Sequence, residues 1–343
     1  MEKIKVVLIG YGYWGPNLAR NIFLNSNYQL MAIIDQEESR RNLANSLYGV
    51  PTYSSNTDLD DSLDIDLAII CTRPSSHKSL AIHFIKKKIS VLITKPCGLS
   101  SSEAHEISTL ASDFGVKAFS DFTYHYSPLI KFLESNQKAA EIVSEMREYS
   151  SYRTSLGIVQ SDVDVLADLA VHDIYILLLL KLSLPKSVSC LRTNSMNDSQ
   201  LHAAFITLKW EDGFIAAIHV SWNSPKKVRL ISITSRNHGI LVEEMNPEAP
   251  IQIVEFSPDS SDYSDLTAEE RFKRNVSFTM GNLEIPNIEM YEALALEVDT
   301  IAIVLNSPES GLITPNADSA AYVWKVVEAL RESDRLGGIT QHV

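Results

Sequence analysis

The chain has 343 residues, of which 45% are apolar and 21% are charged. This composition is typical of globular proteins and excludes disordered, collagen-like and coiled-coil classes. At roughly 150 residues per domain, the length indicates two domains. The 30 basic and 43 acidic side chains give a formal net charge of −13, which argues against nucleic acid and anionic membrane surfaces as partners.

The cysteines Cys71, Cys97 and Cys190 are too scattered for a disulfide framework, and none belongs to a CxxC pair that could hold a metal ion. We therefore expect no metal site and a reducing, cytoplasmic environment. The longest apolar run, Ile174 to Leu180, covers about a third of the roughly 20 residues that a bilayer requires. The apolar run near the N-terminus is too short for a signal peptide, so neither a membrane span nor secretion is expected.

The first 120 residues alternate short β-branched runs with longer segments of helical apolar spacing, which indicates βαβ units and a parallel sheet covered on both faces. The expected strands are Ile4–Ile9, Gln29–Ile34, Leu67–Cys71, Ser90–Ile93 and Lys117–Ser120. The expected helices are Pro16–Leu24, Ser39–Leu47, His77–Lys87 and Ser102–Phe114.

After residue 121 the pattern changes to one helix, Val165–Lys181, followed by successive strands with short connections. Such hairpins predict a large, mainly antiparallel sheet. The expected strands are Ser187–Arg192, His202–Trp210, Phe214–Trp222, Val228–Ser235, Gly239–Glu244 and Ile251–Phe256, with an exposed loop at Asp259–Asp265 and closing helices at Glu289–Leu305 and Ala317–Asp334. Because polar residues alternate poorly in several strands, we expect helices on one face of this sheet and a second subunit on the other.

The first strand runs into Gly10, Gly12 and Gly15 in a GxGxxG pattern, and a helix follows from Pro16. In this strand–turn–helix context the first glycine permits the tight turn and the second lets the backbone approach a pyrophosphate, while the third lets helix and strand pack closely. The free N–H groups at the start of the helix then hold the phosphates. The pattern predicts a Rossmann-type dinucleotide-binding domain over residues 1–120 and leaves residues 121–343 as a substrate-binding and oligomerisation α/β domain, whose last helix is free to pack back on the first.

Asp35 ends the second expected strand. A carboxylate at that place accepts hydrogen bonds from the adenosine ribose and repels a 2′-phosphate, which favours NAD over NADP. Arg40 and Arg41 lie close in the sequence and keep NADP open as an alternative.

Lys95, in the run Thr94-Lys95-Pro96, directly follows a strand of the first sheet. The carboxyl end of a parallel strand borders the crevice in which ligands bind, so this lysine can hydrogen-bond a hydroxyl group or relay a proton. By itself the run also fits an ordinary loop lysine; the neighbouring motifs favour a role in the site.

Asp168 and His172 are four residues apart on an expected helix and therefore share one face. The carboxylate can orient the imidazole, and such a pair suits a general base that removes a hydroxyl proton. The alternative is a satisfied helical histidine beside an acid. His77 fits a packed or capping side chain better than a ligand, and the cluster Tyr124-His125-Tyr126 suits either the substrate or the domain interface. No GxSxG, Walker lysine or HExxH motif is present, so serine-hydrolase, P-loop and zinc-protease classes have no support.

Together these motifs resemble the glucose-fructose oxidoreductase, inositol dehydrogenase and MocA family, and the later ones are similar to its branch that acts on nucleotide sugars. The resemblance rests on Gly10–Gly15 with Pro16-Asn17, Thr72 with His77, Lys95-Pro96, Tyr126-Ser127-Pro128, Arg153–Gly157, Asp164–Asp173 and Ser221–Pro225. It implies a Rossmann domain, an α/β domain whose open sheet forms dimers or tetramers, and hydride transfer between nicotinamide and a secondary alcohol or ketone carbon of a sugar, here a nucleotide-activated one.

The resemblance also implies roles for residues. Catalysis would fall to Lys95, Asp168 and His172. The cofactor would contact Gly10, Gly12, Tyr13, Trp14, Gly15, Asp35, Thr72, Arg73, His77 and Lys95, and the substrate would contact Tyr126, Arg153, Asp168 and His172.

Two positions depart from the family pattern. Thr94 stands where the family usually has Glu, and Arg73 where it commonly has Pro, which puts the environment of Lys95 in question. Two other functions therefore stay open: a redox-assisted glycosidase that uses the dinucleotide transiently, and a non-catalytic dinucleotide-binding sensor.

Overall fold

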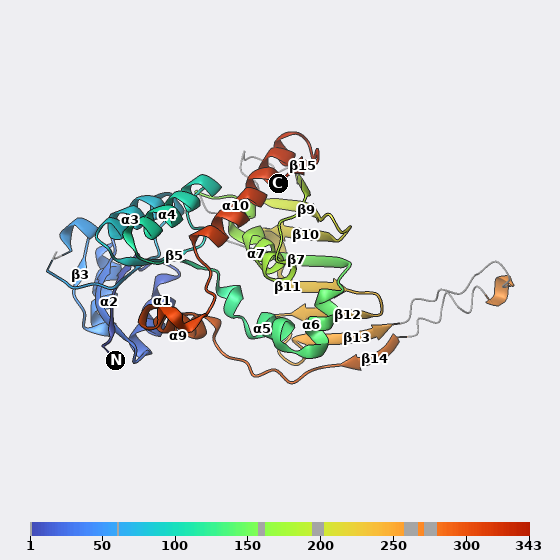
Figure 1. Ribbon diagram of the computed structural model, residues 1–343, viewed down its shortest axis with the longest axis horizontal. Helices are drawn as coiled ribbons and strands as arrows, with labels where there is room; N and C mark the ends of the chain where they lie inside the picture. Colours follow the sequence, from blue (N-terminus) through green and yellow to red (C-terminus); the bar gives the residue numbers. More distant parts are fainter. Residues whose placement is uncertain (1, 60–61, 157–161, 194–201, 257–266, 271–279) are drawn as a thin grey trace.

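The computed structural model describes residues 2–59, 62–156, 162–193, 202–256, 267–270 and 280–343, and Figure 1 shows two sheets side by side. Gly157 and the expected loop Asp259–Asp265 lie outside these ranges. No helix in the ranges is both long and apolar enough to cross a bilayer.

The first sheet has six parallel strands in the order β3-β2-β1-β4-β5-β6, the arrangement of doubly wound dinucleotide-binding domains. The strands are β1 Ile4–Ile9, β2 Tyr28–Ile34, β3 Thr52–Tyr53, β4 Leu67–Ile70, β5 Ser90–Thr94 and β6 Ala118–Asp121. The short β3 was not predicted, because two half-buried residues give no periodic signal. The five predicted strands agree with the structure to within a residue or two.

Helices cover both faces of this sheet, as its continuously apolar strands require. They are α1 Gly15–Leu24, α2 Glu38–Tyr48, α3 Pro74–Lys86 and α4 Ser101–Phe114, with a 3₁₀ turn at Asn56–Asp58. Apolar side chains of α1 pack on one face with Val6 and Leu8, and those of α3 and α4 pack on the other with Val7 and Ile9. The helix α3 begins three residues earlier than expected, because Pro74 suits a first helical turn.

The segment after β6 is helical, although its residues show no clear periodic pattern. It contains a 3₁₀ turn, Thr123–Tyr126, and two short helices, α5 Pro128–Ser135 and α6 Gln137–Ser144. These elements lead into the second sheet.

The second sheet has nine strands in the order β14-β13-β12-β11-β7-β10-β9-β8-β15. Their bounds are β7 Glu148–Leu156, β8 Ser187–Arg192, β9 Ala203–Lys209, β10 Ile215–Ser221, β11 Asn223–Thr234, β12 His238–Glu243, β13 Ile251–Phe256, β14 Met280–Glu284 and β15 Gln341–His342. Its pairs are antiparallel except β7 with β10, which run parallel at the centre of the sheet. The expected fold, a Rossmann sheet with a second, mainly antiparallel sheet, is confirmed.

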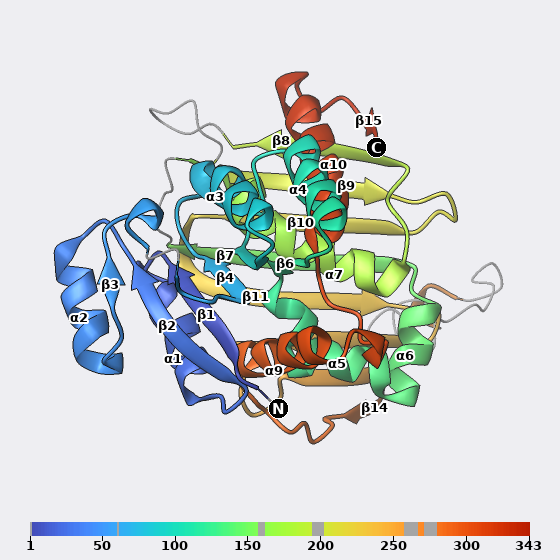
Figure 2. The ribbon, with the colours of Figure 1, turned by 60° about the vertical axis from the view of Figure 1, so that its left-hand side comes forward.

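The single helix expected over Val165–Lys181 is two elements: a π-helical turn, Leu166–Ala170, and α7, Val171–Lys181. The closing helices are α9 Ala293–Asn306 and α10 Ala317–Arg335, with a 3₁₀ turn at Pro308–Ser310 between them. Both closing helices reach the first sheet's helices. Apolar residues of α9 pack in one cluster with those of α1, while α10 lies between α4 and β8, as Figure 2 shows.

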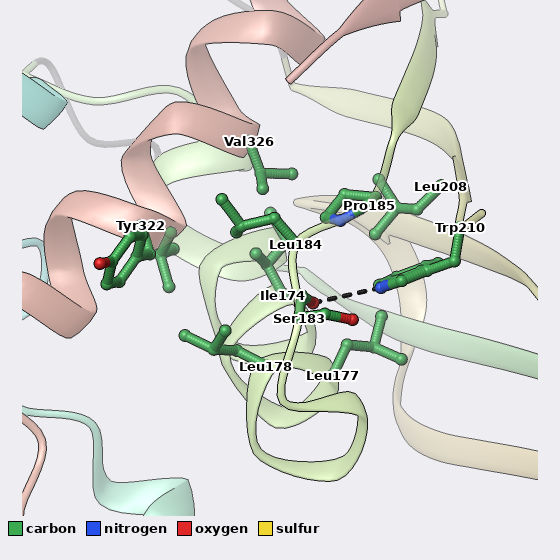
Figure 3. Close-up of a pocket in the computed structure, with 11 residues that line it drawn as sticks. Ile174, Leu177, Leu178, Ser183, Leu184, Pro185, Leu208, Trp210, Tyr322 and Val326 are labelled. Atoms are coloured by element: carbon green, nitrogen blue, oxygen red, sulfur yellow. Dashed lines mark hydrogen bonds between the residues drawn. The ribbon is translucent and has the colours of Figure 1, made fainter. Parts of the chain in front are cut away.

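An apolar hollow lies between α7, α10 and β9 (Figure 3), where Trp210 Nε1 donates a hydrogen bond to the Ser183 carbonyl at 3.1 Å. Its lining residues include no carboxylate, imidazole or basic side chain. The hollow is therefore a gap in the packing of the last helix against its neighbours, and the candidate functional site lies in another part of the structure.

Candidate functional site

The carboxyl ends of the first sheet's strands gather the residues that the sequence singled out. Gly10 follows β1, Asp35 follows β2, Thr72 follows β4 by one residue, and Lys95 follows β5. The strand order reverses between β1 and β4, and ligands of open α/β sheets bind in the crevice at such a point.

At two of the three glycines of the loop, the surrounding backbone leaves no space for a side chain. Gly10 has φ +96°, and a Cβ there would lie 2.2 Å from the Cys71 carbonyl oxygen; a Cβ at Gly15 would lie 2.4 Å from the carbonyl oxygen of Gly10. At Gly12 the nearest atom to an added Cβ would be 3.7 Å away, on the flexible Arg40 side chain. The loop thus packs tightly against the sheet and leaves its outer side at Gly12 free for a pyrophosphate, so the residues fit a dinucleotide.

Asp35 is nearly buried, and its carboxylate braces two backbone segments of the loop region. Oδ2 accepts a hydrogen bond from the N–H of Tyr11 at 2.7 Å, and Oδ1 accepts one from the N–H of Glu37 at 2.8 Å. Arg40 Nη1 lies 3.8 Å from Oδ2 and Arg40 Nη2 lies 3.1 Å from a Glu37 oxygen. The carboxylate is held where it can meet a ribose, and a cation stands beside it at the surface.

The two aromatic residues of the glycine loop point to different surroundings. Tyr13 is 88% exposed. Trp14 is half-buried and donates a hydrogen bond from Nε1 to Asp121 Oδ2 at 2.9 Å. The loop is therefore tied to the end of β6 through Trp14.

The turn after β4 is held by His77. This side chain is fully buried, with Nδ1 2.9 Å from the Pro96 carbonyl oxygen and Nε2 3.0 Å from that of Thr72. Burial lowers the pKa of His77. Thr72 is half-buried and Arg73 is exposed at the start of α3. His77, which its own position predicted to be packed or capping and the resemblance placed at the cofactor, is enclosed between the Thr72 turn and the Lys95-Pro96 turn and aligns them.

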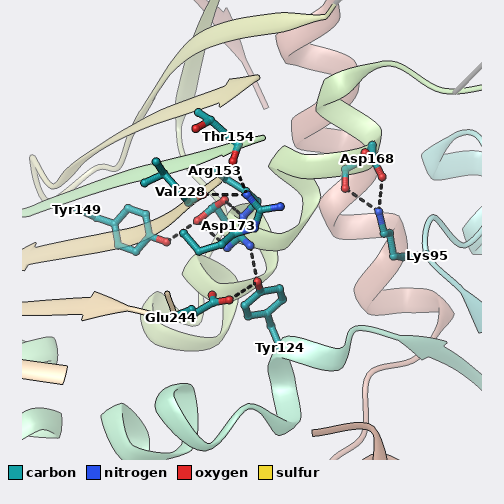
Figure 4. Close-up of polar contacts among 10 residues, drawn as sticks. Lys95, Tyr124, Tyr149, Arg153, Thr154, Asp168, Asp173, Val228 and Glu244 are labelled. Carbon is teal, nitrogen blue, oxygen red and sulfur yellow. Dashed lines mark hydrogen bonds and ion pairs between the residues drawn. The ribbon is translucent and has the colours of Figure 1, made fainter. Parts of the chain in front are cut away.

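Lys95 forms an ion pair with Asp168, which joins the first sheet to the π-helical turn of the second half (Figure 4). Lys95 Nζ donates to Asp168 Oδ1 at 2.5 Å and to the Asp168 carbonyl at 2.7 Å. The other carboxylate oxygen, Oδ2, accepts a hydrogen bond from Trp222 Nε1 at 2.8 Å. Trp222 belonged to the motifs of the resemblance, but its role as the second partner of Asp168 was not predicted.

His172 does not pair with Asp168, contrary to the expectation from their spacing. Asp168 lies in the π-helical turn, where the residue spacing differs from that of an α-helix, and its carboxylate is taken by Lys95 and Trp222. His172 Nδ1 is buried and has no hydrogen-bond partner in the described part of the chain. Burial and then the charge of Lys95 and two arginines lower the pKa of His172 well below its usual value. The imidazole is therefore neutral at neutral pH.

Arg153 was expected to contact the substrate. Its guanidinium group instead donates hydrogen bonds to neighbouring side chains (Figure 4). Nε donates to Asp173 Oδ2 at 2.6 Å, and Nη1 donates to the Tyr124 hydroxyl at 2.5 Å. Tyr149 donates its hydroxyl hydrogen bond to the other oxygen of Asp173 at 3.0 Å, and Glu244 accepts one from Tyr124 at 3.0 Å. Burial raises the pKa of Tyr124 to about 12 and raises the pKa of Glu244. This buried hydrogen-bond network reaches His172 through the ring of Tyr124 and supports its packing.

Tyr124, and not Tyr126, borders the site. The ring centroid of Tyr124 is 5.0 Å from that of His172, whereas Tyr126 is 2% exposed and lies in the interior near Glu297. The expectation for Tyr126 is thus corrected: residues two apart on a 3₁₀ turn face different sides.

Arg229 was not predicted, because nothing in its sequence surroundings distinguishes it from other strand residues. It sits opposite Arg153 in the register of β11 and β7, so both side chains share one face of the sheet. Arg229 is half-buried, and its Nη1 donates to the carbonyls of Thr154 and Val228 at 3.0 and 2.8 Å. Its charge contributes to the lowered pKa of His172. In the described ranges no carboxylate lies within ion-pair distance of Arg229.

Residues 4–122 match the family model of an oxidoreductase family with an NAD-binding Rossmann fold. The rhizopine catabolism protein MocA of Rhizobium meliloti is 25% identical over 140 residues, which are 40% of this chain and 44% of that protein. The chain therefore matches less than half the length of this curated relative.

Solved structures resemble the chain over its whole length. A UDP-N-acetylglucosamine 3-dehydrogenase from Acidithiobacillus ferrooxidans has a TM-score of 0.80 at 18% identity and covers 98% of this chain and 99% of its own. A protein of gentamicin A biosynthesis, solved in complex with NAD, has a TM-score of 0.80 at 15% identity and covers 100% and 97%. At these identities the likeness shows a shared fold.

The strand order, the glycine loop and the matched family model agree with the resemblance expected from the sequence. Over residues 4–122 the chain is therefore similar to the NAD-binding Rossmann-fold oxidoreductases of the glucose-fructose oxidoreductase, inositol dehydrogenase and MocA family.

Proposed function

We propose that the protein is an NAD-dependent dehydrogenase or reductase that acts on a secondary alcohol or ketone carbon of a sugar. The observation that carries the proposal is the Lys95–Asp168 ion pair, which connects the crevice of the dinucleotide domain to the segment that holds His172. The glycine loop, open at Gly12, and the braced carboxylate of Asp35 support NAD at the same edge of the sheet.

In this proposal each residue has a defined task. Bound NAD supplies the hydride acceptor at its nicotinamide ring. The neutral imidazole of His172 accepts the proton that the hydroxyl group loses, since its lowered pKa keeps it unprotonated. Lys95 Nζ donates a hydrogen bond to the same oxygen, and Asp168 orients this ammonium group.

We further propose that the sugar carries an anionic group such as a nucleoside diphosphate. Among the described cations that face the site, Lys95 and Arg153 are paired with carboxylates and Arg229 is not. An unpaired, half-buried guanidinium suits a phosphate or carboxylate oxygen. The structural likeness to a UDP-N-acetylglucosamine 3-dehydrogenase supports the same class.

The test is nicotinamide absorbance with a panel of free sugars, sugar phosphates and nucleotide sugars. We expect turnover by the wild-type chain, a loss of at least about 100-fold in kcat for Lys95→Ala, and unchanged NAD affinity. Lys86→Ala, an exposed lysine on α3, is the matched control and keeps full activity. Full activity of Lys95→Ala would overturn the assignment, and so would release of an aglycone without net cofactor reduction, which identifies a redox-assisted glycosidase. Tight NAD binding with no turnover on any substrate would indicate a sensor.

We also propose that the protein is a cytoplasmic homodimer or homotetramer assembled through the face of the second sheet that the described helices leave uncovered. Apolar side chains are exposed there on adjacent strands: Tyr152 at 49%, Leu191 at 55%, Phe205 at 53% and Ile215 at 41%. His219 stacks on Phe205 with ring centroids 4.3 Å apart and meets Tyr152 edge-on. The three free cysteines fit a reducing compartment.

A further inference from the structure

Two carboxyl groups from distant parts of the chain meet beneath the glycine loop. Glu297, from α9, is 1% exposed, and Asp121, at the end of β6, is 2% exposed. Neither carboxyl oxygen of Glu297 receives a hydrogen bond from a described residue, and the group that faces it is the carboxyl of Asp121. The pair belongs to neither the ion pair of Lys95 nor the network of Arg153.

The partners of the two groups are unequal. Burial raises the pKa of Asp121, and this shift is opposed by hydrogen bonds that Asp121 accepts from Thr123 Oγ1 at 2.7 Å and Trp14 Nε1 at 2.9 Å and by the charge of Lys95. Within the described part of the chain, Glu297 has no cation or donor of this kind. Burial and the adjacent Asp121 carboxylate raise the pKa of Glu297 well above its usual range.

Two ionised carboxylates cannot be buried side by side without a large electrostatic cost. A proton on Glu297 removes that cost and gives Glu297 a donor for Asp121, whose oxygens already orient Trp14. The remaining titratable groups around the pair do not supply a counter-charge, since burial raises the pKa of each; they are Tyr28, Cys71, Tyr126 and Tyr175.

We propose that Glu297 is a protonated positioning residue: it shares its proton with Asp121, and this acid pair fixes Trp14 and thereby the glycine loop. Helix α9 would in this way hold the cofactor loop of the first domain from below. The part of the inference that concerns NAD rests on the proposed function, whereas the shared proton does not.

Helix α9 offers a matched control in Glu292, an ion-paired carboxylate near its start. Glu292 binds Arg20 through two hydrogen bonds of 3.0 and 2.6 Å, and these lower the pKa of Glu292. Stability from Glu292 is thus present above the ordinary carboxyl pKa and lost as the pH falls. For Glu297, with a raised pKa, stability is present below the ordinary value and lost as the pH rises through the folded-state value.

The first experiment uses the protein without cofactor. Infrared difference spectra between wild type and Glu297→Gln at neutral pH should show the carbonyl band of a protonated carboxylic acid in the wild type only, and Glu292→Gln should not remove this band. In urea unfolding across pH 5 to 9, Glu297→Gln should flatten the loss of stability toward high pH that the wild type shows. An absent band, or equal pH slopes, would overturn the shared proton.

The second experiment measures NAD binding by calorimetry together with Trp fluorescence. Glu297→Gln keeps a neutral donor to Asp121 and should bind NAD like the wild type. Glu297→Ala and Asp121→Asn, which break the pair, should bind about tenfold more weakly, as expected for one lost charge-assisted hydrogen bond. Equal affinity in all three variants would overturn the positioning role. If no variant binds NAD but the infrared band is present, the proposed function fails and the acid pair stands.

Discussion

Among the residues that the structure describes, three cations lower the pKa of His172, and two of these three pair with carboxylates. Lys95 is held by Asp168 and Arg153 by Asp173, while Arg229 bonds only to backbone carbonyls. The positive charges together with burial favour the neutral form of His172. Its ability to accept a proton therefore extends to more acidic pH than that of an ordinary histidine.

Arg229→Gln tests this coupling. Removing a positive charge raises the pKa of His172, so the acidic limb of kcat/KM should move to higher pH, and NMR titration of His172 in the isolated protein should show the same direction. KM for an anionic sugar should rise about tenfold while that for a neutral sugar stays the same. Arg236→Gln, which removes the same charge at an exposed position between β11 and β12, should change neither quantity. An unmoved acidic limb in Arg229→Gln would show that Arg229 does not act on His172.

The sequence placed Lys95 directly after a strand and Asp168 and His172 on a helical segment, because strand ends and helical spacing are local features. It paired Asp168 with the wrong partner, since a π-helical turn cannot be read from residue spacing. Arg229, Tyr124 and Glu297 reach their places through tertiary packing of strands and helices far apart in the chain. No pattern within one segment indicates such contacts.

At the scale of elements, the glycines of the loop have different roles. Some are required by the packing of the fold, and one is required, in the proposed function, by the ligand that binds. Gly10 and Gly15 lie against backbone carbonyls, whereas an added Cβ at Gly12 would meet only the flexible Arg40 side chain, at 3.7 Å. A side chain at Gly15 therefore disturbs the fold, and a side chain at Gly12 disturbs only what binds above it.

We expect Gly12→Ala to unfold at the wild-type midpoint and to bind NAD at least about tenfold more weakly, because the added methyl group occupies the approach of the pyrophosphate. Gly15→Ala should lose about 1–3 kcal/mol of stability through overpacking against the Gly10 carbonyl. Urea unfolding and calorimetric NAD titration measure both effects. A Gly12→Ala variant with wild-type affinity would remove the loop from the cofactor site.

A strand could be predicted from the sequence where its residues form a clear apolar pattern. The longer strands of the first sheet are continuously apolar and were found, unlike the two-residue β3, and most strands of the second sheet were also found. The strand β7 was missed although it is central, because its inward-facing residues include Ser151 and Arg153 in place of an apolar pattern. Arg153, one of the polar residues that obscured the strand pattern, belongs to the hydrogen-bond network beside His172.

At the scale of the whole molecule, the second sheet presents an unusually apolar face for a protein with a net charge of −13. A second copy of the chain brought to this face would bury aromatic and aliphatic side chains and few charges. The charged surface elsewhere would keep the assembly soluble.

If the protein forms the proposed oligomer, Phe205→Lys should convert it to monomers, since the substitution places a charge at the centre of the proposed interface. We expect the dissociation constant to rise at least about thirtyfold, as for a central interface residue, measured by light scattering and sedimentation over a concentration series. Leu182→Lys changes a residue that is more exposed, at 85%, but lies at the end of α7, and it should leave the assembly intact. A monomeric wild type would refute this interface.

The return of α9 to the first sheet bears on the order in which the protein folds during synthesis. Leu294, Val298 and Ile301 complete the apolar cluster over one face of a sheet whose last strand ends at Asp121, as the position of α9 beside α1 in Figure 2 illustrates. At about 5–20 residues per second, the ribosome needs on the order of ten seconds or more to deliver that helix after β6. Until then the nascent first domain has an exposed apolar face, so its final consolidation is a late event that awaits nearly the whole chain.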